Sequence, residues 1–405
     1  NSRPATSRSA APGKPPRMCG RWTITVAAGI LAVVGNVLSP LLSRLWRLPQ
    51  IEVSAQSKDA AAVRIGMLGA SFIGKVAIVY AAGKRRDVVV AAVASRDHAR
   101  AQAFASAAGI PRHFGGPSAY DDLLAMEDLD AVYISLPTGL HVRWAKAALA
   151  AGKHVLLEKP AALNANEVAE LQRAAEAAGR LLVEAAHYRH HPAALRMRKL
   201  MRKAELGRLE QVDAEFSMLD PKAWFQSAFG FGVAAEQRAH ERIKNLDRWW
   251  YCADELIWMT GAVSWNVVSA KEERFAVSAE IVLDIPESEG SDAKPPQTRQ
   301  VRATLSMSRD RFLPLFAWNF RARGIAAAAA LTNIGFPFLY HSVDVTGEGG
   351  ARQQEQFYGL GETTFEYQLA AFVAGVRGGA VLPPLDGVER TFALIDDVLA
   401  AAGAR

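Results

Sequence analysis

A carboxylate and an ammonium stand side by side where a short apolar strand is expected to end. The stretch GKHVLLEKP, residues 152–160, holds an apolar run from His154 to Leu157 that stops before Pro160, which predicts a buried strand. Glu158 and Lys159 therefore fall at the carboxyl end of that strand, where open parallel sheets bind ligands. On these residues alone, a ligand-binding lysine and a surface ion pair both remain open.

A glycine-rich turn provides a second chemical signal. VRIGMLGASFIGKVA follows the G-x-G-x-x-G pattern, with serine in the middle place. Glycines permit a tight turn and let a pyrophosphate approach the amino end of the next helix, whose amides favour anions. The pattern is weak alone, but its place in the first βαβ unit predicts a dinucleotide site. The residues expected there are Gly69, Ser71, Phe72, Ile73 and Gly74.

The end of the next expected strand bears on which dinucleotide binds. A free ribose usually meets an acidic residue at this point, whereas this chain has Ser95 and Arg96. A hydroxyl and a guanidinium suit a 2′-phosphate. We therefore expect NADP to be preferred, with NAD as the second choice and an ordinary solvated arginine as the alternative.

The elements that position these residues alternate in kind from residue 63 onward. Short apolar runs predict strands at 63–68, 88–94, 131–136, 154–158 and 181–185. Amphipathic stretches between them predict helices at 72–82, 98–108, 141–151 and 164–178, the last opened by the capping pair Asn164 and Glu167. Such alternation indicates a parallel doubly wound sheet, the Rossmann arrangement.

After residue 192 the pattern changes to longer strands. Strands are expected at 211–218, 275–285, 299–308, 317–323 and 326–333, and helices at 194–203, 365–376 and 388–402, with a hairpin loop at 286–297. The predicted fold class is α/β, with an N-terminal Rossmann domain at 63–185 and a C-terminal α+β domain at 186–405. The second domain should hold a large, mostly antiparallel open sheet.

Composition narrows the function classes. The chain has 405 residues, half of them hydrophobic, enough for the cores of two domains. Residues 1–50 contain seven basic and no acidic residues, which leaves 40 basic against 41 acidic in the remainder. The folded part is therefore near neutral, and no nucleic-acid partner is expected. Cys19 and Cys252 are the two cysteines, so neither a disulfide framework nor a metal site is expected.

The amino-terminal stretch 1–62 reads as a basic disordered tail, an apolar segment and a linker. Residues 22–42 contain no charge, and this length suits one membrane span. A cleavable targeting signal is the alternative. A span would leave the amino terminus cytosolic and the enzyme on the far side, whereas the cytosolic nicotinamide pool favours the cytoplasm. Membrane contact and location therefore stay open.

Several motifs occur in an order that resembles one family. They are the glycine turn, ASRDHARAQAFA, YDDLL, DAVYISLPTGLHVRWAKAALAAGKHVLLEKP, EAAHYRHHP and GETTFEYQLAAFVAGVRGG. The chain resembles the glucose-fructose oxidoreductase/inositol dehydrogenase/rhizopine-catabolism (Gfo/Idh/MocA) family, and within it the dihydrodiol dehydrogenase and NADP-dependent D-xylose dehydrogenase groups. The resemblance is strong over 63–218 and looser over 250–405.

This resemblance implies roles for residues near the first sheet. It implies that Lys159 is catalytic and that Glu158 helps to fix its surroundings. Residues of the LPTGLH motif match positions that line the cofactor at or near the nicotinamide ribose: Leu136, Pro137, Thr138 and His141. His187, Arg189 and His191 match a segment at the domain junction, where substrate contact and structural hydrogen bonding are both open.

A second catalytic element is implied by NLDRWWYCADELIWMTG. Asp247 and Tyr251 keep the spacing of the family's Asp-x-Gly-x-Tyr stretch, but Trp249 stands where glycine is expected. Tyr251 would take a proton from the substrate hydroxyl, and Asp247 would bind a sugar hydroxyl. The adjacent tryptophans could stack on a ligand. The alternative is that this aromatic cluster is core.

The expected function is hydride transfer between C1 of an aldose such as D-xylose and NADP, giving the lactone. A trans-dihydrodiol is the rival substrate, and a sugar reductase working in the other direction is a further option. A non-catalytic nucleotide-sensing regulator is the alternative of another class. The family also implies a homodimer formed through the open sheet.

Overall fold

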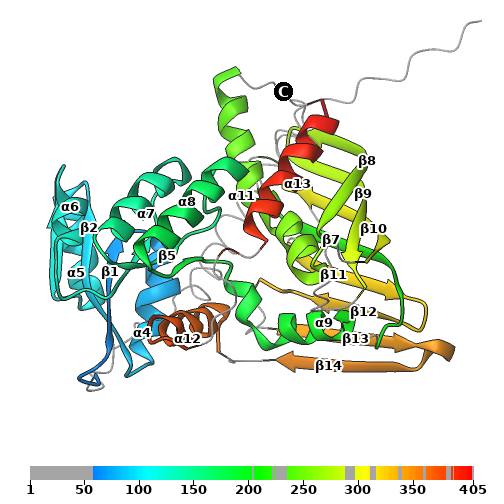
Figure 1. Cartoon of the computed structure of the whole chain (residues 1–405), viewed down its shortest axis with the longest axis horizontal. Helices are drawn as coiled ribbons and strands as arrows, with labels where there is room; N and C mark the ends of the chain where they lie inside the picture. Colours follow the sequence, from blue (N-terminus) through cyan, green and yellow to red (C-terminus); the bar gives the residue numbers. More distant parts are fainter. Residues whose placement is uncertain are drawn as a thin grey trace, which may run out of the picture. The chain divides into compact units, whose positions relative to one another are not determined.

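Two sheets make up the folded part of the chain (Figure 1). The computed structural model describes residues 58–202, 205–220, 223, 235–287, 297–310, 316–335, 340–358, 362–379, 385 and 387–403. The expected tail and the apolar segment 22–42 lie outside these ranges, so both stay predictions. Within the described ranges, no helix combines the length and the hydropathy that crossing a membrane requires.

The first sheet is parallel and six-stranded, in the order β3-β2-β1-β4-β5-β6. Its strands are β1 (Val63–Leu68), β2 (Val88–Ser95), β3 (Arg112–Gly115), β4 (Ala131–Ile134), β5 (His154–Leu157) and β6 (Leu182–Glu184). Most are short runs of aliphatic residues buried on both faces, as parallel sheets require. The strand order reverses between β1 and β4, which makes that point the ligand-binding crevice of such a sheet.

Helices cover both faces of this sheet. One face packs against α6 (Ala119–Leu124), α7 (His141–Ala150) and α8 (Ala165–Ala178). The other packs against α5 (His98–Ala108) and a continuous helical stretch made of α3 (Phe72–Gly74), a π-helix (Lys75–Tyr80) and α4 (Ala81–Gly83). The doubly wound prediction is therefore confirmed. Both β3 and α6 were not predicted, since each is short and only partly apolar.

The predicted cap of α8 forms as a hydrogen-bonded pair. The Asn164 side chain accepts a hydrogen bond from the Glu167 amide at 3.0 Å. The Glu167 carboxylate in turn accepts from the Leu163 amide at 2.9 Å, one residue earlier than a capping box would place it.

The second sheet is eight-stranded, in the order β14-β13-β12-β11-β7-β10-β9-β8. Its strands are β7 (Leu209–Met218), β8 (Ser264–Glu273), β9 (Ala276–Pro286), β10 (Thr298–Ser308), β11 (Phe316–Gly324), β12 (Ala327–Thr332), β13 (Tyr340–Gly347) and β14 (Arg352–Tyr358). All neighbours pair antiparallel except β10 and β7. The open, mostly antiparallel sheet is confirmed, and the pairing of β9 with β10 makes them the predicted hairpin.

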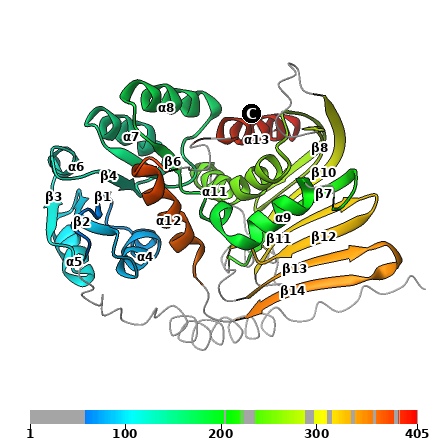
Figure 2. The ribbon, with the colours of Figure 1, turned by 60° about the horizontal axis from the view of Figure 1, so that its bottom comes forward.

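Three helices lie on one face of the second sheet (Figure 2). They are α9 (Pro192–Arg202), α11 (Ala235–Thr260) and α13 (Val388–Ala401). Sequence patterning missed α11, β8, β13 and β14. In α11 the aromatic run was interpreted as a motif, and its apolar residues are too continuous to show a helical stripe.

The helix α12 (Thr364–Val376) returns to the first sheet although it comes late in the chain. Its apolar side chains Phe365, Leu369, Phe372 and Val373 pack in one core cluster with Ile65. The predicted boundary at residues 185 and 186 falls between the two sheets, but α12 brings the C-terminal part back to the Rossmann core. The beginning of α12 thereby reaches the carboxyl edge of the first sheet.

Candidate active site

The glycine turn after β1 is shaped for close approach by a ligand. Gly69 has a φ of +108°, and a Cβ there would lie 2.8 Å from the Ser135 carbonyl oxygen. A Cβ on Gly74 would lie 2.6 Å from Met67 Cε. Larger residues would therefore strain or fill the turn. A tight turn that leads into the start of a helix is the arrangement that binds the pyrophosphate of a dinucleotide.

Ser71 ties the glycine turn to the neighbouring strand β4. Its Oγ accepts a hydrogen bond from the Gly74 amide at 3.0 Å and donates to Ser135 Oγ at 2.8 Å. The Phe72 side chain is 59% exposed, whereas Ile73 packs against the core beneath. Ser135, which sequence reasoning missed, therefore joins the two strands that flank the crevice.

Two arginines lie at the end of β2. Ser95 is buried, and its Oγ accepts a hydrogen bond from the Asp97 amide at 3.3 Å. Arg96 is exposed. Arg100, not foreseen from the sequence, donates from Nε to the Ala70 carbonyl at 3.0 Å. Its guanidinium therefore lies against the glycine turn, four residues beyond Arg96 on the chain.

His141 is buried beneath the loop that follows β4. Its Nε2 lies 2.7 Å from the Leu136 carbonyl oxygen, and its Nδ1 lies 2.9 Å from that of Pro160. Burial lowers the pKa of His141, and the hydrogen bonds to the backbone oppose this effect by raising it. Since both ring nitrogens face carbonyl groups, His141 joins the loop after β4 to the segment after β5. Its predicted contact with the ribose stays a prediction.

The other residues of that loop face the edge of the sheet. Leu136 and Thr138 are half-buried, and Pro137 is exposed. Thr138 begins a single 3-10 turn, Thr138–Leu140, that leads into α7. The loop thus stands beside the glycine turn, at the end of the strand next to β1.

Glu158 and Lys159 point to different partners. The Glu158 carboxylate is buried and accepts a hydrogen bond from the Tyr133 hydroxyl at 2.6 Å. Burial, with this carboxylate, raises the pKa of Tyr133 well above its ordinary value. The half-buried Lys159 instead places Nζ 4.2 Å from the centroid of the Tyr251 ring. Because the Glu158 carboxylate is buried, it does not fit the surface ion pair that the sequence left open.

Tyr251 stands in α11 among other aromatic rings. Its ring lies 4.2 Å from that of Trp318 and stacks on Phe216, with centroids 5.6 Å apart and planes inclined by 14°. Trp318 and Phe216 are register partners on β11 and β7. Sequence reasoning missed both, because a pairing across two strands leaves no local signal.

His187 lies on the hydroxyl side of Tyr251. Its Nε2 is 3.5 Å from the Tyr251 hydroxyl, and its Nδ1 is 2.8 Å from Thr364 Oγ1 at the start of α12. Burial, with the positive charge of Lys159 nearby, lowers the pKa of His187 to about 3. The ring is therefore neutral at physiological pH. The GETTFEYQ motif carried Thr364, although its role was not predicted.

Arg189 is held in a buried ion pair. Its Nε donates to Asp254 Oδ2 at 3.0 Å, and its Nη2 donates to Oδ1 of the same carboxylate. Asp254 also accepts from the Tyr188 hydroxyl at 2.5 Å and from Thr391 Oγ1 at 3.1 Å. These contacts join the turn at His187–His190, α11 and α13. The geometry thus favours the structural alternative for Arg189.

His191 makes contacts of the same structural kind. Its Nδ1 accepts from the Ala193 amide at 3.2 Å, and its ring meets those of His341 and Tyr367 edge-on, at 5.2 and 5.3 Å. Burial and the neighbouring His341 lower the pKa of His191 to about 4.

The remaining predicted residues lie on α11. Asp247 falls one turn before Tyr251, but its side chain lies outside the described residues, so its role stays a prediction. Trp249 and Trp250 are 1% and 0% exposed. The expectation that these two rings stack on a ligand is therefore wrong, and both belong to the core.

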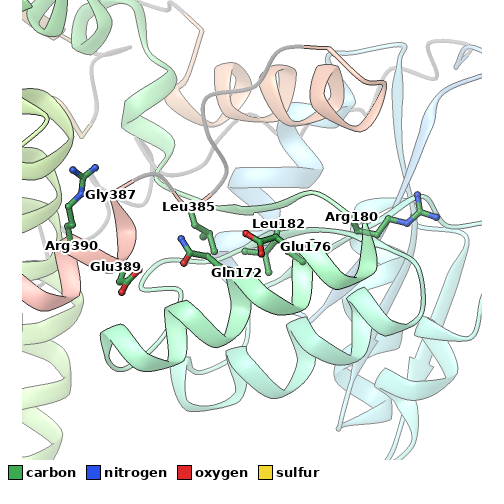
Figure 3. Close-up of a pocket in the computed structure, with 10 residues that line it drawn as sticks. Gln172, Glu176, Arg180, Leu182, Leu385, Gly387, Glu389 and Arg390 are labelled. Carbon is green, nitrogen blue, oxygen red and sulfur yellow. The ribbon is translucent and has the colours of Figure 1, made fainter. Parts of the chain in front are cut away.

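A separate hollow of about 720 Å³ opens between α8 and the start of α13 (Figure 3). Gln172, Glu176 and Arg180 line it from the α8 side, and Glu389 and Arg390 line it from α13. None of the predicted site residues belongs to it. Within the part of the chain that the structure describes, no three His, Cys, Asp or Glu residues are grouped to hold a metal ion.

The residues that form the first sheet and its helices match a known protein family. Residues 63–186 match the family described as an oxidoreductase family with an NAD-binding Rossmann fold. A D-xylose 1-dehydrogenase (NADP(+)) from Haloferax volcanii is 44% identical over 156 residues, covering 38% of this chain and 46% of its own. A trans-1,2-dihydrobenzene-1,2-diol dehydrogenase from Oryctolagus cuniculus is 30% identical over 228 residues, covering 55% and 63%. The matched region thus spans about half to three fifths of these relatives.

Solved structures share the whole two-sheet fold. A 3-ketoreductase from Actinomadura kijaniata, in complex with NADP and TDP-benzene, is 23% identical with a TM-score of 0.64. An aldose-aldose oxidoreductase from Caulobacter crescentus, complexed with glycerol, is 18% identical with a TM-score of 0.66. Each alignment covers 84% of this chain and 98% of the other. At these identities the likeness shows the fold alone.

Proposed function

Because residues 63–186 form an NAD-binding Rossmann domain of the Gfo/Idh/MocA oxidoreductase family, we propose that this protein is an NADP-dependent sugar dehydrogenase. It oxidises C1 of an aldose such as D-xylose to the lactone. The observation that carries the proposal is the Lys159 ammonium over the Tyr251 ring at the carboxyl edge of β5. The relative from Haloferax volcanii supports the choice of substrate class.

The residues present fit the cofactor. At Gly69 and Gly74 a Cβ would meet Ser135 or Met67, so glycine is what lets the chain turn tightly from β1 into the helix whose start would face the pyrophosphate. Ser95 and Arg96 would bind the 2′-phosphate, together with Arg100 from the first turn of α5. The loop at 136–138 would line the nicotinamide ribose. When bound, the nicotinamide supplies the hydride acceptor.

Tyr251 is the group proposed to take the substrate proton. A free tyrosine has a pKa of about 10, too high for a base at neutral pH. An ammonium close to the ring favours the phenolate, so Lys159 makes proton acceptance easier. The neutral His187 ring can accept from Thr364 Oγ1 at Nδ1 and carry its proton on Nε2, which then donates to the Tyr251 oxygen and also favours the phenolate.

Lys159 has a second proposed role at the substrate. As the C1 hydroxyl loses its proton, negative charge develops on that oxygen, and a fixed ammonium stabilises it in a water-poor site. Asp247 would hold another sugar hydroxyl. Arg189 has a proposed structural role. Its ion pair with Asp254 fixes the position of α11, the helix that carries Tyr251.

The experiment that tests this function is a substrate panel on the full chain. Aldoses and trans-dihydrodiols are each offered with NADP and with NAD, and reduced nicotinamide is followed by its absorbance. We expect turnover of an aldose with NADP. Nucleotide binding without turnover of any sugar or diol would contradict the proposal and favour the nucleotide-sensing regulator.

A trans-dihydrodiol is a second candidate substrate. The rings of Phe216 and Trp318 pack against Tyr251, and Phe365 lies 4.4 Å from the His187 ring. Such an aromatic surrounding suits a flat cyclic diol. The Oryctolagus cuniculus relative supports this alternative, and the same panel decides between them.

The outer face of the second sheet is proposed as a homodimer interface. Arginine side chains bond there to polar partners on the neighbouring strand: Arg321 donates to the Glu215 carboxylate at 3.3 Å, and Arg323 donates to the Gln211 side-chain oxygen at 2.6 Å. A sheet face built this way can pair with its own copy about a two-fold axis. Light scattering on the wild type and on Arg321→Glu tests it, with a monomeric wild type as the contradicting result.

The apolar segment at 22–42 is proposed as an anchor or targeting signal. Removing residues 1–54 should leave activity unchanged and alter where the protein is found. Fractionation of cells that express both forms measures this, and identical distribution would contradict it.

A further inference from the structure

Glu255 is a fully buried acid that lies on α11, one helical turn beyond Tyr251. Residues four apart share one face of a helix, and both of these side chains contact Trp318 of β11. Glu255 is 0% exposed. Its Oε1 accepts a hydrogen bond from Trp318 Nε1, and its Oε2 has no hydrogen-bond partner among the described residues. The acid therefore bonds to a ring that also touches the proposed base.

The Trp318 indole is held at both of its edges. Nε1 is bonded to Glu255 at one edge. At the other edge, a Cβ on Gly335 would lie 2.1 Å from Trp318 Cε3 and 2.4 Å from Cζ3, so a larger residue would displace the ring. The Tyr251 ring lies against the indole, with centroids 4.2 Å apart. A fixed indole therefore gives Tyr251 a fixed neighbour.

The bond to Glu255 determines how the indole is oriented. An indole nitrogen can only donate a hydrogen bond, and a buried donor that loses its acceptor carries the cost of its desolvation. Without the Glu255 oxygen, the Trp318 ring would gain by turning its N–H towards water or another acceptor. Tyr251 would then lose the surface against which it packs, and its hydroxyl would no longer be fixed in one position.

The protonation state of Glu255 suits an acceptor that takes no part in proton transfer. Burial raises the pKa of the Glu255 carboxyl well above its ordinary value, the hydrogen bond from Trp318 lowers it, and the charge of Asp254 raises it further. This direction favours a neutral acid, whose carbonyl oxygen still accepts the indole N–H. Glutamine has nearly the same size, carries no charge and keeps such an oxygen. Glu255→Gln should therefore preserve the bond, whereas Glu255→Leu removes it.

We propose that Glu255 is a positioning residue that holds the Trp318 indole against Tyr251 and thereby fixes the proposed base. It acts by accepting the indole N–H and touches neither cofactor nor substrate. The effect on catalysis rests on the proposed function, whereas the effect on the Tyr251 ring does not.

The catalytic test compares three variants of the full chain with the wild type. Asp397→Leu is the matched control, because Asp397 of α13 accepts the indole N–H of Trp265 on β8 at 2.8 Å, away from the proposed site. A small misplacement of a catalytic group costs up to about 100-fold in rate, so kcat should fall about 10- to 100-fold in Glu255→Leu. It should recover to within threefold of wild type in Glu255→Gln and stay unchanged in Asp397→Leu. The dissociation constant for NADP should stay within twofold in all three.

Two kinetic results would overturn the proposal. They are a wild-type kcat in Glu255→Leu, and a Glu255→Gln enzyme as slow as Glu255→Leu. A double-mutant cycle then tests whether Glu255 acts through the indole. Trp318→Phe removes the N–H, so adding Glu255→Leu to it should slow kcat by less than threefold. A further tenfold loss would show that Glu255 acts by another route and would contradict the proposal.

A measurement without substrate separates this inference from the proposed function. The eight tyrosines are replaced with 3-fluorotyrosine, and the fluorine NMR signal that Tyr251→Phe removes is assigned to Tyr251. In Glu255→Leu this signal should broaden or split, because the ring no longer has one position. In Glu255→Gln and Asp397→Leu it should stay as in the wild type.

An unchanged Tyr251 signal in Glu255→Leu would overturn the proposal, whether or not the sugar panel shows turnover. If Glu255→Leu does not fold, Trp318→Phe takes its place. A wild-type kcat, or a Tyr251 signal as sharp as that of the wild type, would then be the contradicting result.

Discussion

The Nζ atom of Lys159 lies 4.2 Å from the centroid of the Tyr251 ring, although 92 positions separate the two residues in the chain. Lys159 comes from the end of β5 in the parallel sheet, and Tyr251 from a helix that covers the second sheet. A cation at this distance from a phenol ring contributes about 0.5–2 kcal/mol of attraction. The contact therefore joins the cofactor-binding part to the part that carries the proposed base.

Removing only the Tyr251 hydroxyl should separate chemistry from binding. Tyr251→Phe keeps the ring beneath Lys159 and the stack on Phe216. Because general acid–base help contributes about 10²–10⁴-fold to rate, kcat should fall by about that factor. The dissociation constant for NADP should stay within twofold.

Steady-state kinetics and nucleotide titration measure both quantities. Tyr120→Phe removes a hydroxyl from a buried ring in α6, far along the chain from this site, and serves as the matched control. A Tyr251→Phe enzyme with wild-type kcat would show that the hydroxyl takes no part.

Cofactor preference should depend on two guanidiniums. Replacing Arg96 or Arg100 with Ala removes a donor from the proposed 2′-phosphate site. A hydrogen bond to a charged group contributes about 1.5–3 kcal/mol, so KM for NADP should rise about 10- to 100-fold. KM for NAD should change less than threefold.

Comparing the two cofactors in the same preparation measures this, with Arg112→Ala as a control, because Arg112 of β3 pairs with Asp128 in the turn before β4. An equal loss for both nucleotides would assign the arginines to general stability instead.

Breaking the buried ion pair should destabilise the fold. Asp254→Ala leaves Arg189 charged, buried and without its carboxylate partner, and removes the acceptor for Tyr188 and Thr391. Loss of one partner of a buried pair costs about 3–5 kcal/mol. Urea unfolding should show that decrease, whereas Asp128→Asn, at an exposed pair, should lie within about 1 kcal/mol of wild type. If Asp254→Ala also lowered the free energy of unfolding by no more than about 1 kcal/mol, the ion pair would not be what fixes α11 in the fold.

Acid should weaken the protein through its buried histidines. The pKa of His187 is lowered to about 3 by burial, while an unfolded histidine titrates near about 6.5. Between these values the unfolded chain binds more protons, so stability falls as pH falls. From pH 7 to pH 4 this one group should remove about 3 kcal/mol.

Denaturant unfolding at both pH values tests this prediction by comparing wild type with His187→Asn. The His187→Asn side chain cannot take up that proton. Its free energy of unfolding should therefore decrease by about 3 kcal/mol less than that of the wild type between pH 7 and pH 4. Parallel losses in the two proteins would contradict the neutral, buried state of His187.

Local sequence patterns correctly predicted the structural features that depend only on residues close together in the chain. The parallel sheet, the glycine turn and the cap at Asn164 each have a short signature, and each was confirmed. The long helix α11 was missed, because its last turns are apolar on every side. The pairing of Trp318 with Phe216 and the return of α12 depend on tertiary structure. For Trp249 and Trp250 the sequence offered both ligand stacking and core packing, and their burial shows that they belong to the core.

The same distinction, between a local signal in the sequence and a contact made only in the folded protein, applies to individual site residues. Gly69 was identifiable because a turn with positive φ favours glycine, whereas the role of Lys159 was inferred from the family resemblance and stays a prediction. Thr364 and Glu255 stood inside quoted motifs, but their partners, His187 and Trp318, are evident only in three dimensions. For Arg189 the sequence left substrate contact and structural hydrogen bonding open, and the buried bond to Asp254 favours the structural role.

The central claim is that the Lys159 ammonium acts on the bound substrate, and Lys159→Met tests it most directly. Methionine keeps a flexible chain of similar length without the charge. Single-turnover reduction of NADP by the aldose that the panel identifies should be at least 100-fold slower in the variant, with NADP affinity within threefold of wild type. A single-turnover rate equal to that of the wild type would contradict the account.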